Sequence, residues 1–500
     1  MISLLLRIQV ALMGNRMSEE VWSYFVCKVS SEGRTPRFEI FSSLEDARTW
    51  CNSVQAEDDE KKGEKRSDSP VAGFTPEDIM LLLNRFIDQI ASYKALFAVT
   101  ASMRSIVYKS VVRREITERA EGQYKEVEEV SGYTIRAIMS SQFAEFDRAL
   151  DTVLEIGRGL SVLPGSNLLS LVATFDSFIA DIAFRSVRGR PDFFDDATMV
   201  PLKMLAGLSS LEGVLDQLAW QQAQDCMRGS HTAQIQFLEK ISSTAIIKEF
   251  ERWPEFVEIF ERRNLVAHNS LIVNRTYLNN VSEAGYDVTS IEIGSLLAVS
   301  GDYLGSSVDI LLEFGILLLY SFWKKRYKNS AVKAYESLNE IAYDLIRRKN
   351  PLVASRILNF ALNKQRHIGP DAIAKRMTVN LANCYKKMND NDRLNSTLSS
   401  MDWSSSSDTF KICIAALNED VERVVSLMPK VTDDQEEVGI EGFRHWPVFD
   451  AVRDDPRFIM SFESTFEEPL RASSFEQEKL VETANIEVPA GLAKSSGSIH

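Results

Sequence analysis

The residues of this chain best suited to chemistry lie in one short stretch, WPEFVEIFERRNLVAHNSLIVNRTYL, residues 253–278. Arg263 carries a cation, Asn264 an amide, and His268 an imidazole that ionises near neutral pH. Asn264 and His268 are four residues apart, so on a helix they share a side and the amide can orient the imidazole. An arginine and a titratable imidazole at the end of one helix suit phosphodiester chemistry.

The spacing of apolar residues in this stretch predicts a helix over residues 253–268, with Pro254 where a helix can begin. One face of this helix follows the i, i+3, i+4, i+7, i+11 rhythm of a buried stripe, formed by Phe256, Ile259, Phe260, Arg263 and Ala267. Arg263 should therefore point toward the interior of the protein. Because a buried guanidinium is costly when it stands alone, we expect an anionic group to meet it.

The string Arg263-Asn264-x3-His268 resembles the R-N-x3-H motif of HEPN ribonucleases. The continuation HNSLIVN, residues 268–274, is similar to the H-N-G-x-x-V-N stretch of that family. Where the family often has glycine after the H-N pair, this chain has Ser270, which bears on the tightness of the turn and not on the chemistry.

The resemblance implies a fold and a set of supporting residues. It covers roughly residues 130–325 and implies a HEPN helical bundle. The 166–184 region is similar to the family's early core helix, where an acidic residue supports the Arg/His pair, and Asp176 is the candidate here. Asn269 is a second supporting candidate. Since such domains dimerise, the resemblance implies a homodimer with a composite active site.

The resemblance also implies a reaction. In such enzymes the ribose 2′-OH attacks the adjacent phosphate without a metal ion and leaves a 2′,3′-cyclic phosphate and a 5′-OH. His268 would act as general base or acid, Arg263 would stabilise charge on the phosphorane, and Asn264 would position the imidazole or the phosphate. The sequence has no cluster of metal ligands and no phosphate-binding glycine motif, so we expect no metal and no cofactor.

Two basic segments are candidates for guiding an RNA substrate, although helix faces of this kind are more often simply solvated. The candidate RNA-binding residues are Arg104, Lys109, Arg113, Arg114, Arg185, Arg188 and Arg190. The histidines outside the motif are isolated in the sequence and are expected to be incidental, namely His231, His367, His445 and His500.

Composition limits the class of protein. The formal net charge is -14, so this is not a protein that coats nucleic acid by bulk attraction, and an RNA function must rest on a local site. The five cysteines are odd in number and scattered, which fits a reducing cytoplasm and not a disulfide framework. Glycine and proline are sparse, with 23 and 14 residues, which favours a mostly α fold.

The chain divides into five expected parts. They are a small α+β unit at 17–55, with strands in VWSYFVCKV and RFEIF and a helix over 43–54; a charged linker at 56–72; a HEPN-type helical domain at 73–326; tetratricopeptide-like helical repeats at 330–465, forming an α-solenoid; and a flexible tail at 470–500.

Helical periodicity places the first helices at 76–120, 132–158, 166–188, 200–228, 232–250, 253–268 and 306–326. The most apolar stretch, residues 306–323, contains Asp309 and Glu313. The uncharged run that remains is too short to cross a bilayer, so we expect a buried core helix and no membrane contact.

Three functions fit these features. The first is a toxin or antiviral (abortive infection) effector, an RNase restrained until a protein or peptide trigger binds the concave face of the repeats. The alternative is a non-catalytic HEPN scaffold that binds nucleotide or RNA and acts through protein interactions of the repeats. A third is a purely structural adaptor.

Overall fold

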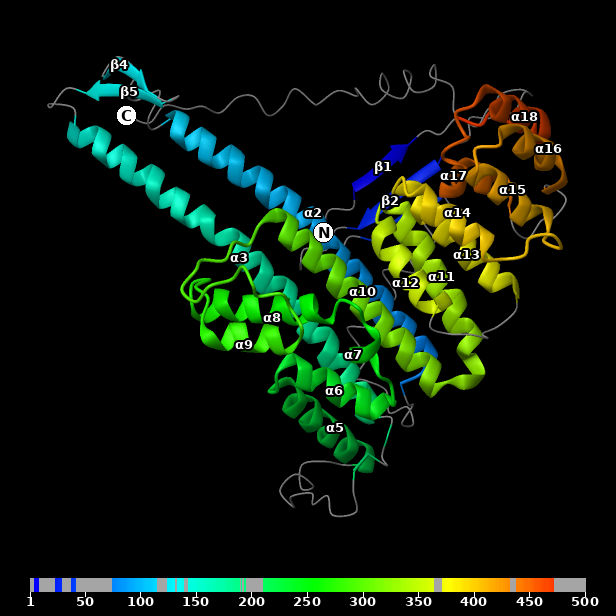
Figure 1. The fold of residues 1–500 in the computed structure, drawn as a ribbon, viewed down its shortest axis with the longest axis horizontal. Helices are drawn as coiled ribbons and strands as arrows, with labels where there is room; N and C mark the ends of the chain where they lie inside the picture. Colours follow the sequence, from blue (N-terminus) through cyan, green and yellow to red (C-terminus); the bar gives the residue numbers. More distant parts are fainter. Residues whose placement is uncertain are drawn as a thin grey trace. The chain divides into compact units, whose positions relative to one another are not determined.

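The protein is mostly helical in the residues that the structure describes, which confirms the expected fold class at that level (Figure 1). The computed structural model describes residues 4–8, 23–28, 37–41, 74–114, 124–130, 133–138, 143–188, 190, 193–194, 210–363, 371–431 and 438–471. The chain forms two compact units, one of residues 70–374 and one of residues 1–69 together with 375–500.

The larger unit contains the 253–278 stretch. Its elements are α2 (Pro76–Val112), β4 (Tyr124–Val130), β5 (Tyr133–Ile138), α3 (Phe143–Arg188), α5 (Leu211–Met227), α6 (His231–Ser242), α7 (Ile246–Glu249), α8 (Trp253–His268), α9 (Arg275–Glu283), α10 (Gly301–Arg326), a short 3-10 helix η3 (Lys328–Ser330), α11 (Ala331–Arg347) and α12 (Pro351–Asn363).

Aromatic side chains fill the centre of this unit. Phe175 on α3 meets Phe256 and Phe260 on α8, each with ring centroids 5.6 Å apart, and meets Phe314 on α10 at 6.2 Å. All four rings are fully buried. Edge and tilted contacts of this kind are favourable for aromatic pairs, and together they fix how α3, α8 and α10 pack.

Helix α10 lies at the core, and its close contact with α2 and α3 depends on Gly315. A β-carbon at Gly315 would lie 2.3 Å from Cε1 of Phe86 on α2 and 3.1 Å from Cε1 of Phe178 on α3. The Phe86 and Phe178 rings are themselves stacked at 3.8 Å between centroids. The absence of a side chain at Gly315 therefore lets the two rings fill the space beside the helix.

Three helices are long and apolar enough, by length and composition alone, to cross a membrane: Pro76–Val112, Asp147–Arg188 and Gly301–Arg326. Only the described part of the chain enters this count. The most apolar window of α10 is 83% buried within the protein, which confirms the expected core helix. The corresponding window of α2 is only 11% buried.

The burial of α2 is low because α2 and α3 run side by side away from the core and form an arm (Figure 1). Strands β4 and β5 follow α2 and precede α3 in the chain, at the outer end of this arm. At its root the Asn167 amide donates to the Thr100 hydroxyl at 3.1 Å. The arm exposes many apolar side chains, among them Leu96, Val99, Met103, Ile106, Val107, Tyr108, Leu150, Leu154 and Val162.

Two predictions about this region are wrong. Tyr133–Ile138 forms strand β5, antiparallel to β4, where a helix was expected, because its β-branched and aromatic residues suit a hairpin. Helix α3 continues unbroken through Pro164, although the sequence predicts an interruption between residues 158 and 166. Packing of α3 against its neighbours outweighs the local cost of an interior proline.

The smaller unit contains a three-stranded antiparallel sheet in the order β1 (Leu4–Ile8), β2 (Ser23–Lys28), β3 (Arg37–Phe41). Strands β2 and β3 fall in the two segments expected to be strands, and β1 precedes the expected start of the unit at residue 17. The helix expected over 43–54, the 56–72 linker and residues 472–500 of the tail lie outside the described residues.

The remaining elements are α13 (Asp371–Lys387), within which the boundary between the units falls, α14 (Asn391–Ser399), α15 (Asp408–Leu417), α16 (Val421–Val431), α17 (Ile440–His445), η4 (Pro447–Phe449) and α18 (Pro456–Phe466). Phe443 on α17 packs on Phe449 of η4 and Phe458 of α18, with centroids 5.0 and 6.2 Å away. The rings join these three elements at the end of the helical region.

We expect Gly315→Ala to lower the free energy of unfolding by about 2 kcal/mol, because the added methyl group overpacks a core whose rings cannot move aside. Gly305→Ala in the same helix is the control: no neighbouring atom lies within 4 Å of its β-carbon, so this change should be neutral or stabilise by up to about 1 kcal/mol. Urea denaturation measures both. Equal midpoints for the two variants would contradict the described packing.

Candidate active site at the end of helix α8

Helix α8 has the bounds that the sequence predicts, Trp253–His268. The first part of its expected buried face is confirmed, since Phe256, Ile259 and Phe260 are almost fully buried. The face then leaves the core: the Arg263 side chain is 24% exposed, and Ala267 is exposed where burial was expected. The helix therefore carries its chemistry-bearing residues out of the core at its C-terminal end.

Arg263 faces an acidic residue, as its position on this stripe requires. Nη2 of Arg263 lies 3.7 Å from Oδ2 of Asp176 on α3. Within the described residues the Nε atom of Arg263 is buried and has no hydrogen-bond partner. The structure thus brings together two of the expected site residues, and it leaves part of the guanidinium without a partner.

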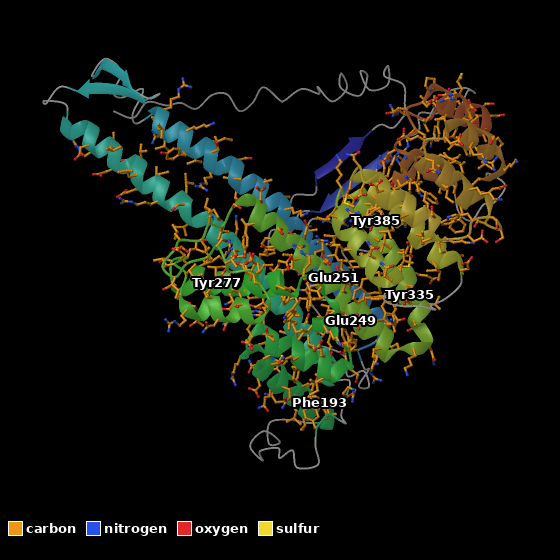
Figure 2. The ribbon with its side chains drawn as sticks, in the orientation of Figure 1. Phe193, Glu249, Glu251, Tyr277, Tyr335 and Tyr385 are labelled. Carbon is orange, nitrogen blue, oxygen red and sulfur yellow. The ribbon has the colours of Figure 1, made fainter. Side chains whose placement is uncertain are left out.

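The arginine that points fully inward is its neighbour, Arg262. Nε of Arg262 donates to Glu258 at 2.7 Å, and Nη1 donates to the Ala298 carbonyl at 2.8 Å. Both oxygens of the Glu258 carboxylate are occupied, because the hydroxyls of Tyr277 on α9 (labelled in Figure 2) and Tyr303 on α10 also donate to it, at 2.7 and 2.8 Å. The guanidinium lies 4.0 Å from the centroid of the Tyr303 ring.

This network shifts the ionisation of its members in the directions that burial dictates. Burial, followed by the charge of Glu258, raises the pKa of Tyr277 and of Tyr303, so both phenols stay neutral donors. Burial alone would lower the pKa of Arg262, but Tyr303 and Glu258 outweigh it and the pKa is raised. Arg262 is therefore a structural cation that ties α8 to α9 and α10.

The chain turns sharply after α8. The Asn269 N–H donates to the Leu265 carbonyl at 2.9 Å, and the Asn269 side-chain amide donates to the carbonyl of Ile272. Ser270 (φ 50°) and Leu271 (φ 64°) then take the left-handed backbone conformation that favours glycine. Ser270 adopts this conformation without being glycine, at a cost of roughly 1 kcal/mol.

Main-chain hydrogen bonds hold this turn against the loop before α10. The Leu297 N–H donates to the Leu271 carbonyl at 3.0 Å, and the Val273 N–H donates to the Ser295 carbonyl at 2.9 Å. The Gly294 N–H returns a bond to the Val273 carbonyl at 2.9 Å. The end of α8 is therefore anchored on its C-terminal side by backbone atoms.

Asn264 and His268 lie on the outward side of this anchored end. Asn264 is half-buried and His268 is exposed. In the part of the chain that the structure describes, no hydrogen bond joins the Asn264 amide to the His268 imidazole. The two groups are accessible from solvent, and the orientation of the imidazole by the amide stays a prediction.

His231 is a member of the site that sequence reasoning missed. It opens α6, and its Nε2 lies 2.8 Å from Oδ1 of Asp176. Its ring stacks on Phe260 of α8 with centroids 3.6 Å apart and planes inclined by 19°. The expectation that His231 is isolated is therefore wrong, because it contacts both Asp176 and Phe260. No local pattern marks it, because 55 residues separate it from Asp176.

Two of the other three histidines, at positions 367 and 500, lie outside the described residues. His445 on α17 is exposed, and its Nε2 lies 3.2 Å from Glu441 one turn earlier on the same helix. This contact is local and touches none of the candidate site residues.

The basic candidates divide into two groups. Four are exposed: Arg104 and Lys109 lie on the outer half of α2, and Arg113 and Arg114 follow directly after its last residue. The other three have internal partners: Arg185 pairs with Asp78 of α2 at 3.4 Å, Arg188 pairs with Asp216 of α5, and Arg190 donates to a carbonyl of α6 at 3.1 Å. The second group therefore joins α3 to its neighbours, whereas the side chains of the first group are exposed.

Among the residues with described side chains, no group of three or more His, Cys, Asp or Glu is placed to hold a metal ion. No family model, curated protein or solved structure matches this chain.

The two adjacent arginines should respond differently to the same substitution. Arg262→Met should lower the free energy of unfolding by about 3 kcal/mol, because it leaves the buried Glu258 carboxylate without its cation. Arg263→Met should cost no more than about 1 kcal/mol, because its single contact with Asp176 is long and partly solvated. Denaturant unfolding of both variants tests this, and a larger loss for Arg263→Met would reverse the assignment.

Relief of the left-handed backbone at the turn gives a second test. Ser270→Gly should raise the free energy of unfolding by roughly 0.5 to 1 kcal/mol, since glycine takes φ 50° without strain. Ser282→Gly in the last turn of α9 is the control, and it should destabilise because glycine is unfavourable within a helix. If Ser270→Gly destabilises as much as the control, the described turn is wrong.

Proposed function

We propose that this protein is a HEPN-type endoribonuclease that cleaves RNA without a metal ion, with Arg263, Asn264 and His268 as its catalytic residues. The observation that carries the proposal is the position of Arg263 at the end of α8, beside Asp176 and on the same helix end as the exposed His268. The R-N-x3-H spacing and the left-handed turn at Ser270 add to it.

The ionisation and exposure of these groups suit a phosphate substrate. Arg263 is partly exposed, and its contact with Asp176 involves only Nη2 at 3.7 Å, so its terminal N–H groups can donate to phosphate oxygens. His268 is exposed, so substrate can reach its imidazole. Asn264 lies between the two in sequence and is half-buried, where its amide can hold either the imidazole or the phosphate.

The proposed reaction follows from these roles. His268 takes the proton of the ribose 2′-OH while that oxygen attacks the adjacent phosphorus. The bond from phosphorus to the 5′ oxygen breaks, and this leaving oxygen takes a proton from a second imidazole, which the partner copy of the motif supplies in a homodimer. Arg263 stabilises the charge that builds on the phosphorane. The products are a 2′,3′-cyclic phosphate and a 5′-OH.

The rest of the proposal concerns how the enzyme is used. We infer that residues 73–326 form the HEPN bundle and that residues 330–465 form a tetratricopeptide-like solenoid, whose concave face receives a protein or peptide trigger. The small N-terminal α+β unit would assist in sensing. A cytoplasmic RNase of this design would serve as a toxin or an antiviral effector of abortive infection, held inactive until the trigger arrives.

Incubation of the purified full chain with total RNA in EDTA tests the proposal. Wild-type protein should cut RNA into fragments with 5′-OH ends, which a polynucleotide kinase labels without prior phosphatase treatment. Arg263→Ala and His268→Ala should each slow cleavage by about a hundredfold or more. Arg275→Ala and His445→Ala, at exposed positions outside the site, should cut at the wild-type rate.

The outcomes separate the alternatives. If wild-type protein binds RNA and dimerises but never cuts it, the protein is a non-catalytic scaffold and the proposal fails. If all four variants cut equally, the activity belongs to another site or to a contaminant. Expression in cells gives an independent measurement: the wild type should be toxic, and His268→Ala should relieve the toxicity whereas His445→Ala should not.

A further inference from the structure

Three helices meet at the carboxylate of Asp176. Its Oδ1 atom is bound by His231 from α6 at 2.8 Å, and its Oδ2 atom faces Arg263 from α8 at 3.7 Å. The His231 side chain is only 13% exposed, and its ring is stacked on Phe260, one turn before Arg263. The imidazole is therefore held by both helices that supply the ion pair.

The distance of 3.7 Å between Nη2 of Arg263 and Oδ2 of Asp176 is long for an arginine–carboxylate pair. A free arginine and carboxylate usually close into a charge-assisted contact of about 2.8 Å, often with two parallel hydrogen bonds. Here one oxygen is taken by His231, and the remaining oxygen stays 3.7 Å from Nη2. His231 thus prevents Asp176 from turning both oxygens onto the guanidinium.

We propose that His231 is a positioning residue of the site, which fixes Asp176 so that Arg263 is aligned but keeps its donors for an RNA phosphate. The R-N-x3-H motif includes neither His231 nor Asp176, so it does not predict this positioning role. Without His231 the Asp176 carboxylate would be free to rotate and accept two hydrogen bonds from Arg263. The charge of Arg263 would then be neutralised by Asp176 and would be less able to bind a phosphate. The kinetic part of this inference rests on the proposed ribonuclease function, and the spectroscopic part does not.

Two substitutions separate the hydrogen bond from the ring. His231→Phe keeps a ring on Phe260 but cannot donate to Asp176, whereas His231→Gln keeps an N–H donor. We expect His231→Phe to lower kcat/KM for RNA cleavage by about tenfold or more, and His231→Gln to restore most of that loss. His445→Phe is the matched control and should change nothing. Equal loss in His231→Gln and His231→Phe would overturn the positioning role.

Combining His231→Phe with Asp176→Asn tests whether His231 affects cleavage through the Asp176 carboxylate. Because His231 acts only through the Asp176 carboxylate, the double variant His231→Phe/Asp176→Asn should be no slower than Asp176→Asn alone. A merely structural role of His231 would make the losses multiply, and that result would overturn the inference. Circular dichroism confirms that each variant is folded.

An imidazole NMR spectrum tests the coupling without any RNA. The chain has only five histidines, so the signals of His231 can be assigned by their loss in His231→Gln. Arg263→Met should shift these signals, because it removes the group that shares Asp176 with His231, and Arg275→Met should not. Unshifted signals in Arg263→Met would overturn the inference. A shift in a protein that cuts no RNA would leave the positioning intact and reject the ribonuclease function.

Discussion

The contact of Phe175 with the rings of α8 is the interaction on which the candidate site depends. Phe175 meets Phe256 and Phe260 inside a core too dense for a buried ring to move without opening a cavity. The contact therefore fixes the register of α3 against α8. Asp176 follows Phe175 directly, and Arg263 follows Phe260 by one turn, so the register that packs the rings also places the carboxylate opposite the guanidinium.

The two consecutive arginines of α8 differ in their burial and in their partners. Arg262 is buried and donates to Glu258 and the Ala298 carbonyl, whereas Arg263 is partly exposed and has one long contact with Asp176. Neighbouring residues on a helix point about 100° apart, so one cation enters the core while the other reaches its edge. A buried guanidinium whose contacts lie inside the protein is out of reach of a ligand in solution. The incomplete pairing of Arg263 is what makes it the candidate for binding phosphate.

Local features of the site could be predicted from the sequence, and features that depend on distant partners could not. Pro254 and the apolar stripe gave the bounds of α8, and the cost of a lone guanidinium pointed to an acid near Arg263. The greater burial of Arg262 depends on Tyr303, 45 residues after Glu258, and the contact of His231 spans 55 residues. Contacts between residues so far apart in the sequence produce no periodic pattern of residue types that could predict them. The continuity of α3 through its proline likewise depends on tertiary packing, which local propensity does not contain.

The turn after α8 has a consequence for how this protein tolerates sequence drift. Its tether to the loop before α10 uses main-chain atoms of Leu271, Val273, Ser295 and Leu297, which every residue type except proline supplies. Gly285 and Gly294 are constrained in this loop, because their φ angles of 90° and 86° disfavour a side chain. The exposed positions of this loop can therefore diverge while the end of α8 stays in place, whereas Val288, Ile291 and Leu297 are constrained because they pack on the buried cluster around Leu265 and Val273. Two descendants that differ at the exposed positions of this loop would still hold the end of α8 in the same place.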